Sequence, residues 1–372
     1  MSTTIDHLEC TVLRAPIASP VANAFGAMTN RPALFLRLVA SDGAWGWGEV
    51  FCNFPQVGAE HRARLLDSIF APLLKGITSD DPAHVRALLE RRTRQMAIQC
   101  GEPGPFAQLT GAIDQALHDL VARRAGVPLW KQLGGQPAVR VYASGIGPDH
   151  VDDIATGKRS EGYRAFKLKV GFGNDRDVAN LAAMRAVLGP EVTIMLDANQ
   201  AWTSAEAPAR IAALAPYAPL WIEEPIAADS SAADWRALAE VSAVPLAAGE
   251  NLRGREVFVQ AIDDGTLAFV QPDVGKWGGV SGGLDIARHA ATRNVAYCPH
   301  WLAGGVGLAA SMHALAASGS PGGYAEVDAN PNPLREEVFP FAIDDGMVTL
   351  SDAPGLGVEP DLKRLGRFIV RH

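Results

Sequence analysis

A regular alternation of two kinds of segment begins near residue 139 and constrains the fold more than any other feature of this sequence. Short apolar runs of strand length recur about every 26 residues, and Ala-rich segments with helical periodicity separate them. The apolar runs cover residues 139–145, 164–170, 192–197, 220–224, 245–250, 267–273, 295–300 and 324–328. The helical segments include residues 175–188, 204–215, 231–242, 254–263, 280–293 and 304–317. Strands alternating with helices predict a parallel α/β sheet, and this many units favour a (β/α)8-type barrel over an open doubly wound sheet. No GxGxxG follows the first run, which further weakens a dinucleotide-binding fold.

The first 125 residues have a different pattern. Apolar runs predict strands, the second of which continues into a Gly/Trp-rich hairpin, and helical periodicity predicts three helices. The strands are expected at 3–14 and 33–40, and the helices at 60–75, 82–98 and 105–125. Segments 16–30 and 51–60 are rich in Pro, Gly and Asn and are expected to be loops. Long loops inside a compact domain are often functional, although a mobile surface loop is an equal alternative for each.

Composition excludes several classes of protein. The chain has 372 residues, of which 48% are hydrophobic and 20% charged, and its formal net charge is −8. This balance, without a basic patch, gives no reason to expect nucleic acid binding. No long uncharged apolar stretch predicts a membrane span, and the amino-terminal residues lack the pattern of a signal peptide. The four cysteines form no CxxC pair and are expected to be reduced thiols, so a cytoplasmic protein is expected.

Polar residues end the predicted barrel strands, each of which is otherwise apolar. They are Lys169, Asp197, Glu223, Glu250, Asp273, His300 and Glu326. The carboxyl ends of barrel strands meet on one face, where catalytic residues collect. One such residue would be read as a helix cap or a loop residue, but consecutive strands with the same feature indicate a site.

Three acids from neighbouring strands, Asp197, Glu223 and Glu250, would lie within a few ångströms of one another. Unpaired carboxylates this close repel, and one would tend to stay protonated. A divalent cation removes the repulsion, and an all-oxygen ligand set favours Mg²⁺ over zinc. The alternative is a structural network of carboxylates and arginines.

Asp273 and His300 end the next two strands. A carboxylate on one strand can accept a hydrogen bond from a ring nitrogen of a histidine on the next, which fixes the tautomer and raises the basicity of the ring. A lone histidine is more often structural than catalytic, but His300 is predicted at the same level as the acids. We therefore expect it to act as an acid or a base.

Two lysines, Lys167 and Lys169, are two residues apart in one predicted strand. Side chains at this spacing point to the same face, where two ammonium groups repel, more strongly if they are buried. A neighbouring cation lowers the pKa of a lysine, so this repulsion is a means of making one of them a base.

The motifs that carry these residues resemble those of the enolase superfamily, in particular its mandelate racemase subgroup. They are KLK (167–169), LDANQAW (196–202), WIEEP (221–225), AAGEN (247–251), QPDVGKWGG (271–279) and CPHW (298–301). The resemblance covers essentially the whole chain and implies an N-terminal α+β capping domain over 1–125. The barrel domain, of (β/α)7β type, would cover 126–339, with segment 340–372 packing back on the cap.

The resemblance also implies a role for each residue. Asp197, Glu223 and Glu250 would bind Mg²⁺, and Lys169 would be the base on one face of the substrate. Lys167 would face the substrate carboxylate and depress the pKa of Lys169. His300, paired with Asp273, would be the acid or base on the opposite face, Glu326 would hydrogen-bond the carboxylate, and Asn199 would contact substrate.

Several neighbouring residues are expected to be structural. Lys276 is expected to lie beyond the strand end without a catalytic role. Glu224 should point away from the site, and Asp328 should belong to the turn that follows its strand. Trp277 and Trp301 should pack or line the pocket.

The implied chemistry is removal of the proton alpha to a carboxylate, through an enediolate. Most relatives with this residue set are dehydratases of acid sugars, so dehydration of an aldonate or aldarate to a 2-keto-3-deoxy acid is expected, by a hydro-lyase. A racemase or epimerase of a 2-hydroxy acid or amino-acid-like carboxylate would use the same residues. A non-catalytic metal- or carboxylate-binding protein is a remote alternative. The resemblance further implies a small-molecule partner and a homo-oligomer, without nucleic acid or membrane.

Overall fold

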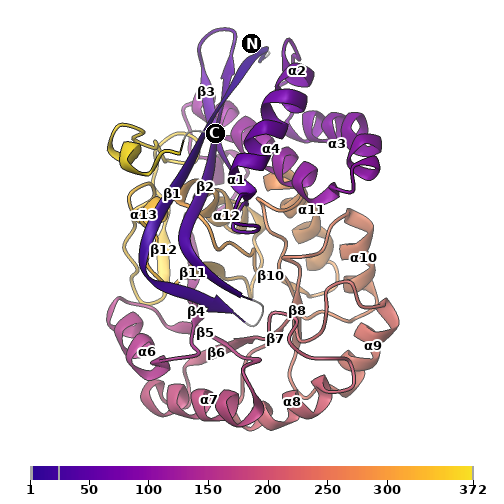
Figure 1. Cartoon of the computed structure of the whole chain (residues 1–372), viewed down its shortest axis with the longest axis vertical. Coiled ribbons are helices and arrows are strands. Elements are labelled where there is room, and N and C mark those ends of the chain that lie inside the picture. Colours follow the sequence, from indigo (N-terminus) through magenta and orange to yellow (C-terminus); the bar gives the residue numbers. More distant parts are fainter. Residues whose placement is uncertain (1–2, 24–25, 371–372) are drawn as a thin grey trace.

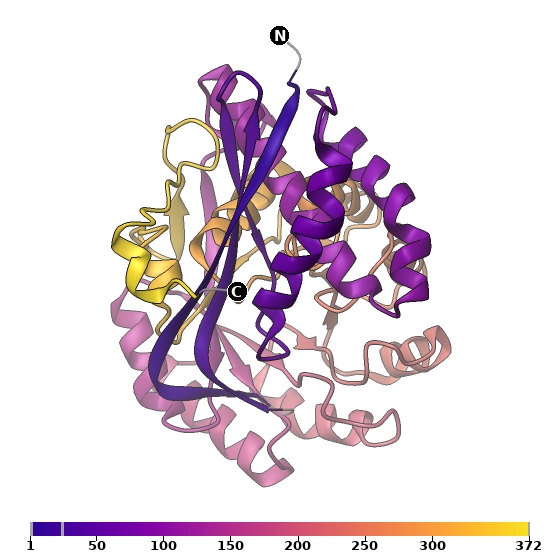
Figure 2. The same ribbon diagram turned by 45° about the horizontal axis from the view of Figure 1, so that its top comes forward.

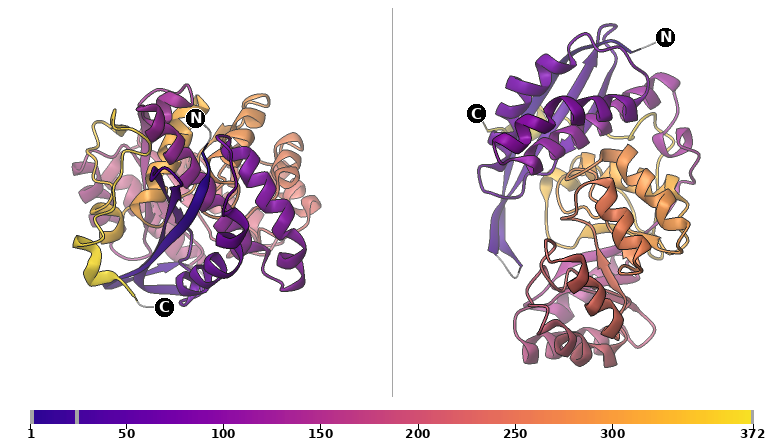
Figure 3. Two further views of the ribbon diagram at one scale, coloured as in Figure 1. Left: turned by 90° about the horizontal axis from the view of Figure 1, so that it is seen from above. Right: turned by 90° about the vertical axis from the view of Figure 1, so that its right-hand side faces the viewer.

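The computed structural model describes residues 3–23 and 26–370. Parallel strands with helices around them form the larger part, and the amino-terminal strands and helices lie over one end of it (Figures 1 and 2). The right-hand view of Figure 3 shows the amino-terminal part stacked on the barrel. This arrangement confirms the predicted fold class.

The amino-terminal part contains an antiparallel sheet with the order β1 (Ile5–Asn23), β2 (Gly26–Ala40) and β3 (Trp45–Val50). Its helices are α1 (Gly58–Leu65), α2 (Ala71–Leu74), α3 (Pro82–Gln99) and α4 (Pro103–Ala125), and a π-helical turn, Leu66–Phe70, joins the first two. Helix α4 packs directly on β3 because two glycines face it. A Cβ at Gly46 would lie 2.0 Å from the carbonyl oxygen of Ala116, and one at Gly48 would lie 2.1 Å from that of Ala112.

The prediction of a loop at 16–30 is wrong. Residues 16–23 continue β1 and residues 26–30 belong to β2, and this pair of strands reaches down beside the barrel (Figure 1), while residues 24 and 25 lie outside the described part of the chain. Pro16 and Pro20 suggested a loop, but the ladder is interrupted between Pro16 and Val21, and prolines are tolerated at such irregularities because no hydrogen bond is needed there. The segment 51–57 is irregular, as predicted, and α1 begins directly after it.

The barrel has eight parallel strands in the order β10-β9-β8-β7-β6-β5-β4-β11. They are β4 (Ala138–Ile146), β5 (Ala165–Lys169), β6 (Thr193–Asp197), β7 (Ile222–Glu223), β8 (Leu246–Ala248), β9 (Phe269–Val270), β10 (Ala296–Tyr297) and β11 (Ala325–Asp328). Strands β7 to β10 are shorter than the apolar runs that predicted them. Pro245, Pro272 and Pro299 lie at their ends and have no N–H for a ladder.

Helices follow the strands around the outside of the barrel (Figure 1). They are α5 (Leu129–Gln132), α6 (Val151–Ser160), α7 (Asn174–Leu188), α8 (Ala207–Leu214), α9 (Ala232–Val241), α10 (Arg255–Asp263), α11 (Gly279–Ala291), α12 (Gly305–Ser318) and α13 (Pro333–Glu336). Two short 3₁₀ helices cover Ala215–Tyr217 and Arg364–Phe368. No helix in the described part of the chain is long and apolar enough to cross a membrane.

The carboxyl-terminal segment contacts both parts. Its strand β12 (Met347–Thr349) pairs antiparallel with β4 of the barrel. Further on, the backbone N–H of Val370 donates to the carbonyl of Val12 in β1, at 2.9 Å. The expected domain bounds, 1–125 and 126–339 with 340–372 assigned to the cap, stay predictions.

Candidate active site

The barrel register places the predicted strand-end residues side by side. Lys169 on β5 is paired with Asp197 on β6, which is paired in turn with Glu223 on β7. Asp273 and His300 form a parallel bridge between the segments that follow β9 and β10. These residues, with Glu250 and Glu326, are all buried, with exposures between 0% and 8%. The predicted constellation therefore exists at one end of the barrel.

The two lysines on β5 are each held by carboxylates. The Lys167 ammonium donates to both oxygens of Glu223, at 2.9 and 2.7 Å, and lies 2.8 Å from Oε1 of Glu326. The Lys169 ammonium donates to Oδ2 of Asp197 at 2.5 Å and to Oδ1 of Asn199 at 2.8 Å. Opposite charges therefore offset the repulsion between the lysines.

The pKa of Lys169 differs from the expectation. Burial lowers this pKa and Lys167 lowers it further, as predicted, but Asp197 and Glu223 outweigh both and raise it above the ordinary value. Lys167 behaves in the same way, because Glu223 and Glu326 raise its pKa well above the ordinary value against the effect of burial. A neutral Lys169 therefore requires that the charge of Asp197 be directed elsewhere.

Each of the three acids predicted to bind metal is paired with a lysine. Asp197 accepts from Lys169 and Glu223 from Lys167, and Oε2 of Glu250 accepts from Lys276. Within residues 3–23 and 26–370, the acidic, histidine and cysteine side chains do not converge in groups of three around a point that a metal ion would fill.

The chemistry of this set nevertheless fits Mg²⁺. Three carboxylates from adjacent strands are buried, and every one of them already faces a cationic group. Oxygen ligands of this kind suit a hard divalent ion. Asp197, Glu223 and Glu250 are therefore the residues that would hold it.

His300 and Asp273 form the predicted pair. Nδ1 of His300 lies 2.5 Å from Oδ2 of Asp273, whose Oδ1 accepts from the backbone N–H groups of Gly275 and Lys276. The other ring nitrogen, Nε2, lies 3.3 Å from Glu250. Burial lowers the pKa of His300, but Glu250, Glu326 and Asp273 together raise it to about 9.

Glu326 is held from three sides. It accepts from the Ser144 hydroxyl and from the backbone N–H of Trp301, at 3.1 Å, besides contacting Lys167. Burial would raise its pKa, but Lys167 and His300 keep it below the ordinary value. Its charge is thereby fixed beside the buried lysine.

A cavity of about 280 Å³ opens at this end of the barrel. Among the predicted site residues, Lys169, Asn199, Glu250 and His300 line it. The other predicted residues lie behind its wall: Lys167, Asp197, Glu223, Asp273 and Glu326. A substrate in the cavity as it stands would therefore meet Lys169 and His300 before Lys167 or Glu326.

The amino-terminal part closes the cavity from above. Met28 of β2 and Phe51 and Asn53 of the loop after β3 line it. The same loop is bonded to the segments that carry the catalytic pair, since Asn53 donates to the carbonyl of Leu302 at 2.7 Å and the N–H of Phe51 donates to that of Gly275 at 3.3 Å. The expectation that segment 51–60 is functional thus has a structural basis.

A buried carboxylate on β3 strengthens this connection. Glu49 accepts from the backbone N–H groups of Gly304 and Gly307 at the start of α12, at 2.6 and 2.9 Å. Burial raises its pKa to about 8, although these hydrogen bonds act in the opposite direction. The amino-terminal sheet thereby anchors the segment that follows His300.

Sequence reasoning missed several polar residues of the site, among them Gln108, Gln200 and Asn251, which line the cavity. The backbone of Lys276 lies beyond β9, as predicted, but its side chain turns back to Glu250 and lines the cavity. Arg253 also lines it, and Gln271 donates to Oε2 of Glu223 at 2.6 Å. Lys276 and Gln271 belong to the QPDVGKWGG motif, which was the available signal; Arg253 follows AAGEN by two residues.

Among the residues expected to be structural, Glu224 and Trp301 lie as predicted. Contrary to the prediction, Asp328 does not belong to the following turn but is the last residue of β11, paired with Ser144 of β4. Glu224 accepts from the side-chain amides of Gln200 and Asn251, and Asp328 accepts from Arg31 at 2.6 Å. The Trp301 ring is buried and its Nε1 donates to the carbonyl of Gly304.

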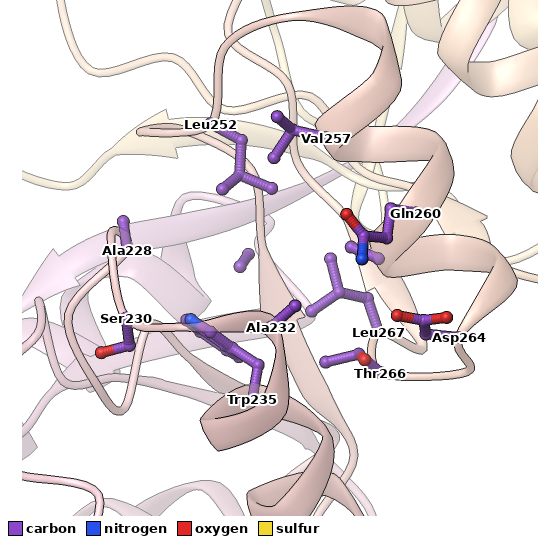
Figure 4. Close-up of a pocket in the computed structure, with 12 residues that line it drawn as sticks. Ala228, Ser230, Ala232, Trp235, Leu252, Val257, Gln260, Asp264, Thr266 and Leu267 are labelled. Atoms are coloured by element: carbon purple, nitrogen blue, oxygen red, sulfur yellow. The ribbon is translucent and has the colours of Figure 1, made fainter.

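A second cavity, of about 220 Å³, lies between α9 and α10 on the outside of the barrel (Figure 4). Trp235, Leu252, Val257 and Leu267 give it a largely apolar lining, with Asp264 at its edge. It contains none of the strand-end acids or bases, so the chemistry of this protein belongs to the barrel mouth.

Comparisons with known proteins agree with this geometry. The family model described as "Mandelate racemase / muconate lactonizing enzyme, N-terminal domain" matches residues 7–134, and "Enolase C-terminal domain-like" matches residues 150–364. A crystal structure of a mandelate racemase/muconate lactonizing enzyme from Bordetella bronchiseptica RB50 is 47% identical, with a TM-score of 0.93, and the match covers 98% of this chain and 99% of that one. A racemase from Streptomyces coelicolor A3(2), solved with bound magnesium, is 31% identical, with a TM-score of 0.89 and coverage of 98% and 100%.

Two curated relatives are named for different activities. D-galactarolactone cycloisomerase from Agrobacterium fabrum is 30% identical over 96% of each chain. D-galactonate dehydratase from Ralstonia nicotianae is 32% identical over 88% of each chain. Both names describe reactions of sugar-derived acids, one an isomerisation and the other a loss of water.

Proposed function

This chain belongs to the enolase superfamily, in its mandelate racemase subgroup, and on that premise we propose that it dehydrates an acid sugar to a 2-keto-3-deoxy acid. The observation that carries the proposal is the placement of Lys169 and His300 in the wall of one cavity, beside three buried carboxylates. Lys169 ends β5 and His300 lies in the segment that follows β10, and these two strands are far apart in the sheet order, so the two side chains would approach a bound substrate from different sides.

The first step is removal of the proton alpha to the substrate carboxylate. Asp197, Glu223 and Glu250 would hold Mg²⁺, which would supply positive charge for the enediolate and share the charge of Asp197, in the combination of base and metal typical of this superfamily. Nζ of Lys169, once neutral, takes the proton, and Asn199 holds that nitrogen in position. The electron pair moves into the carboxylate, which becomes the enediolate.

The second step is loss of the β-hydroxyl group. The enediolate electrons form a carbon–carbon double bond as the C–O bond breaks, and Nε2 of His300 protonates the departing oxygen to give water. Asp273 holds the other ring nitrogen and so keeps Nε2 directed at the cavity. The resulting enol tautomerises to the keto acid, and the atoms balance as substrate minus one water.

An isomerase is the second candidate, favoured by the names of the relatives. The racemase and the cycloisomerase are as similar to this chain as the dehydratase is. In a racemase or epimerase, His300 would return a proton to the opposite face of the same carbon. The first step and its residues are shared by all these reactions, so Lys169 keeps its role in each.

Incubation with a panel of four- to six-carbon acid sugars in D2O with Mg²⁺ tests the proposal. Formation of a keto acid, detected by its semicarbazone and by NMR, is the expected result. Deuterium incorporation with inversion, without a keto acid, would assign an isomerase. If no acid in the panel forms a keto acid or incorporates deuterium, the dehydratase and the isomerase proposals are both wrong, and a non-catalytic binding protein is the remaining alternative. The Lys169→Ala variant is the blank for each assay.

A further inference from the structure

The wall of the active cavity contains more positive charge than the proposed reaction uses. Its charged lining residues are Lys169, Glu250, Arg253, Lys276 and His300, and the remaining lining is apolar or carries neutral amides. Lys169 and His300 have roles in catalysis. Lys276 and Arg253 therefore remain to be explained.

Lys276 pairs with Glu250, which the proposed reaction needs as a metal ligand. Its ammonium contacts Oε2 of Glu250, lies 3.4 Å from Oδ1 of Asn251 and is 4.4 Å from the centre of the Phe51 ring. Only 13% of its side chain is exposed. When Glu250 binds Mg²⁺, its charge is shared, and the ammonium then has Asn251 and the Phe51 ring as its contacts, with the carboxylates of Asp273 and Glu224 acting on it from further away. A buried cation whose direct partner is shared with a metal ion is stabilised by a further anion beside it.

Arg253 is available to a ligand. It lies on the loop after β8 and is exposed, with its guanidinium beside Gly104 at the start of α4. Within residues 3–23 and 26–370, no hydrogen bond or ion pair to its side chain is formed. A guanidinium binds a carboxylate through two parallel N–H donors, which makes it well suited to recognise that group.

Lys276 lies nearer the reaction centre, and Arg253 lies nearer the mouth of the cavity. Lys276 adjoins Glu250, which lies 3.3 Å from His300, whereas Arg253 is at the exposed edge. A substrate whose reacting carboxylate lies at the proposed metal site would extend its other end along this side.

We infer that the substrate is a diacid, whose second carboxylate is bound by Arg253 at the mouth, with Lys276 contributing positive charge between the two ends. The inference rests on the proposed function, since it places the first carboxylate at the metal site. It narrows the substrate class from acid sugars in general to those with a carboxylate at each end.

Equilibrium binding to the Mg²⁺-loaded protein tests this inference without turnover. Calorimetric titration would compare acids that differ only at the far end, galactarate with galactonate and glucarate with gluconate. We expect the diacid of at least one pair to bind ten times more tightly or better. In Arg253→Gln and Lys276→Met the ratio of the two affinities should fall by about ten-fold, and Lys276→Arg should restore part of it.

Arg255→Gln is the matched control. Arg255 is two residues away but pairs with Asp285 on α11 and does not line the cavity, so its ratio should equal that of the unchanged protein. Melting curves of all variants confirm folding. Equal affinity for both members of each pair, no binding of either, or an unchanged ratio in both Arg253→Gln and Lys276→Met would overturn the inference.

The same samples separate the two proposals. Keto acid formed as readily from the monoacid as from the diacid would leave the proposed dehydration intact and overturn the diacid inference. Selective binding of the diacid, without formation of a keto acid and without deuterium exchange, would support the diacid inference and overturn the proposed dehydration.

Discussion

Two buried regions of this protein contain a histidine, and they treat it in opposite ways. At the barrel mouth, His300 faces Asp273, Glu250 and Glu326, which raise its pKa to about 9 in spite of burial. In α12, His313 lies between the backbone N–H of Trp130 and the carbonyl of Leu356, and burial lowers its pKa to about 4. The exposures of the two residues are 4% and 2%.

Burial is therefore the same in both regions, and the partners decide the charge. Carboxylates around His300 stabilise the imidazolium, whereas His313 has one donor and one acceptor, which match a neutral ring. A charged ring at the mouth can give a proton, which is what the loss of the β-hydroxyl group requires. A neutral ring in α12 only connects that helix to its neighbours, Trp130 of α5 and the carboxyl-terminal segment.

The largest effect is expected from removing the base at the mouth. Lys169→Ala should lower kcat by roughly 10³ to 10⁴-fold, the range expected for a positioned general base. Steady-state assays on the substrate found in the panel would measure it. Lys158→Ala, which removes a partly exposed lysine paired with Glu161 on the outside of the barrel, is the control and should keep full activity. Substantial activity in Lys169→Ala would refute the assignment.

The second-largest effect is expected from removing the metal. A chelator is expected to stop turnover reversibly, because the developing enediolate loses several kcal/mol of electrostatic stabilisation. The fold should persist, since Lys167, Lys169 and Lys276 already pair with the three carboxylates. Activity assays with Mg²⁺ added back, and melting curves with and without the metal, would check both parts. Unchanged turnover after chelation would refute the ligand set.

His300→Asn should lower overall turnover by roughly 10² to 10³-fold but spare the first step. Lys169 still removes the alpha proton, so the variant should exchange deuterium at that carbon while it forms little keto acid. NMR of the substrate in D2O separates the two steps. Loss of exchange together with turnover would show that His300 acts in the first step, or that the variant has lost its site.

Much of the barrel mouth could be predicted from the sequence, because the apolar runs mark the strands and the polar residues lie where those runs end. Strands buried on both faces appear as continuous apolar runs, so a polar residue that ends each run stands out, as Asp197 and His300 do. The direction in which a long side chain extends was less predictable. Lys276 lies on a turn, and only the fold shows that its long side chain returns to Glu250.

Local composition gave a wrong prediction for residues 16–30 and no prediction for His313. Prolines made 16–30 look like a loop because a bulge in a hairpin has the same composition. His313 carried no signal, because its partners, the N–H of Trp130 and the carbonyl of Leu356, are backbone groups brought to it by tertiary packing. A pairing of this kind leaves no side-chain pattern.

The smallest effect concerns His313 and appears in stability. A folded-state pKa of about 4, below the ordinary 6.5, means that protons bind the unfolded chain first, so stability is full above pH 6.5 and falls as the pH is lowered toward 4. The loss over the whole window is roughly 3 kcal/mol, of which roughly 2 kcal/mol falls between pH 7 and pH 5. Guanidinium unfolding at the two pH values would measure it.

Other groups also titrate in this range, so the test is a difference between two proteins. His313→Gln keeps one acceptor and one donor but cannot be protonated, and its stability should therefore fall by roughly 2 kcal/mol less than that of the unchanged protein between pH 7 and pH 5. Equal losses in the two proteins would mean that His313 accepts a proton without cost. Its difference from His300 would then come from something other than its partners.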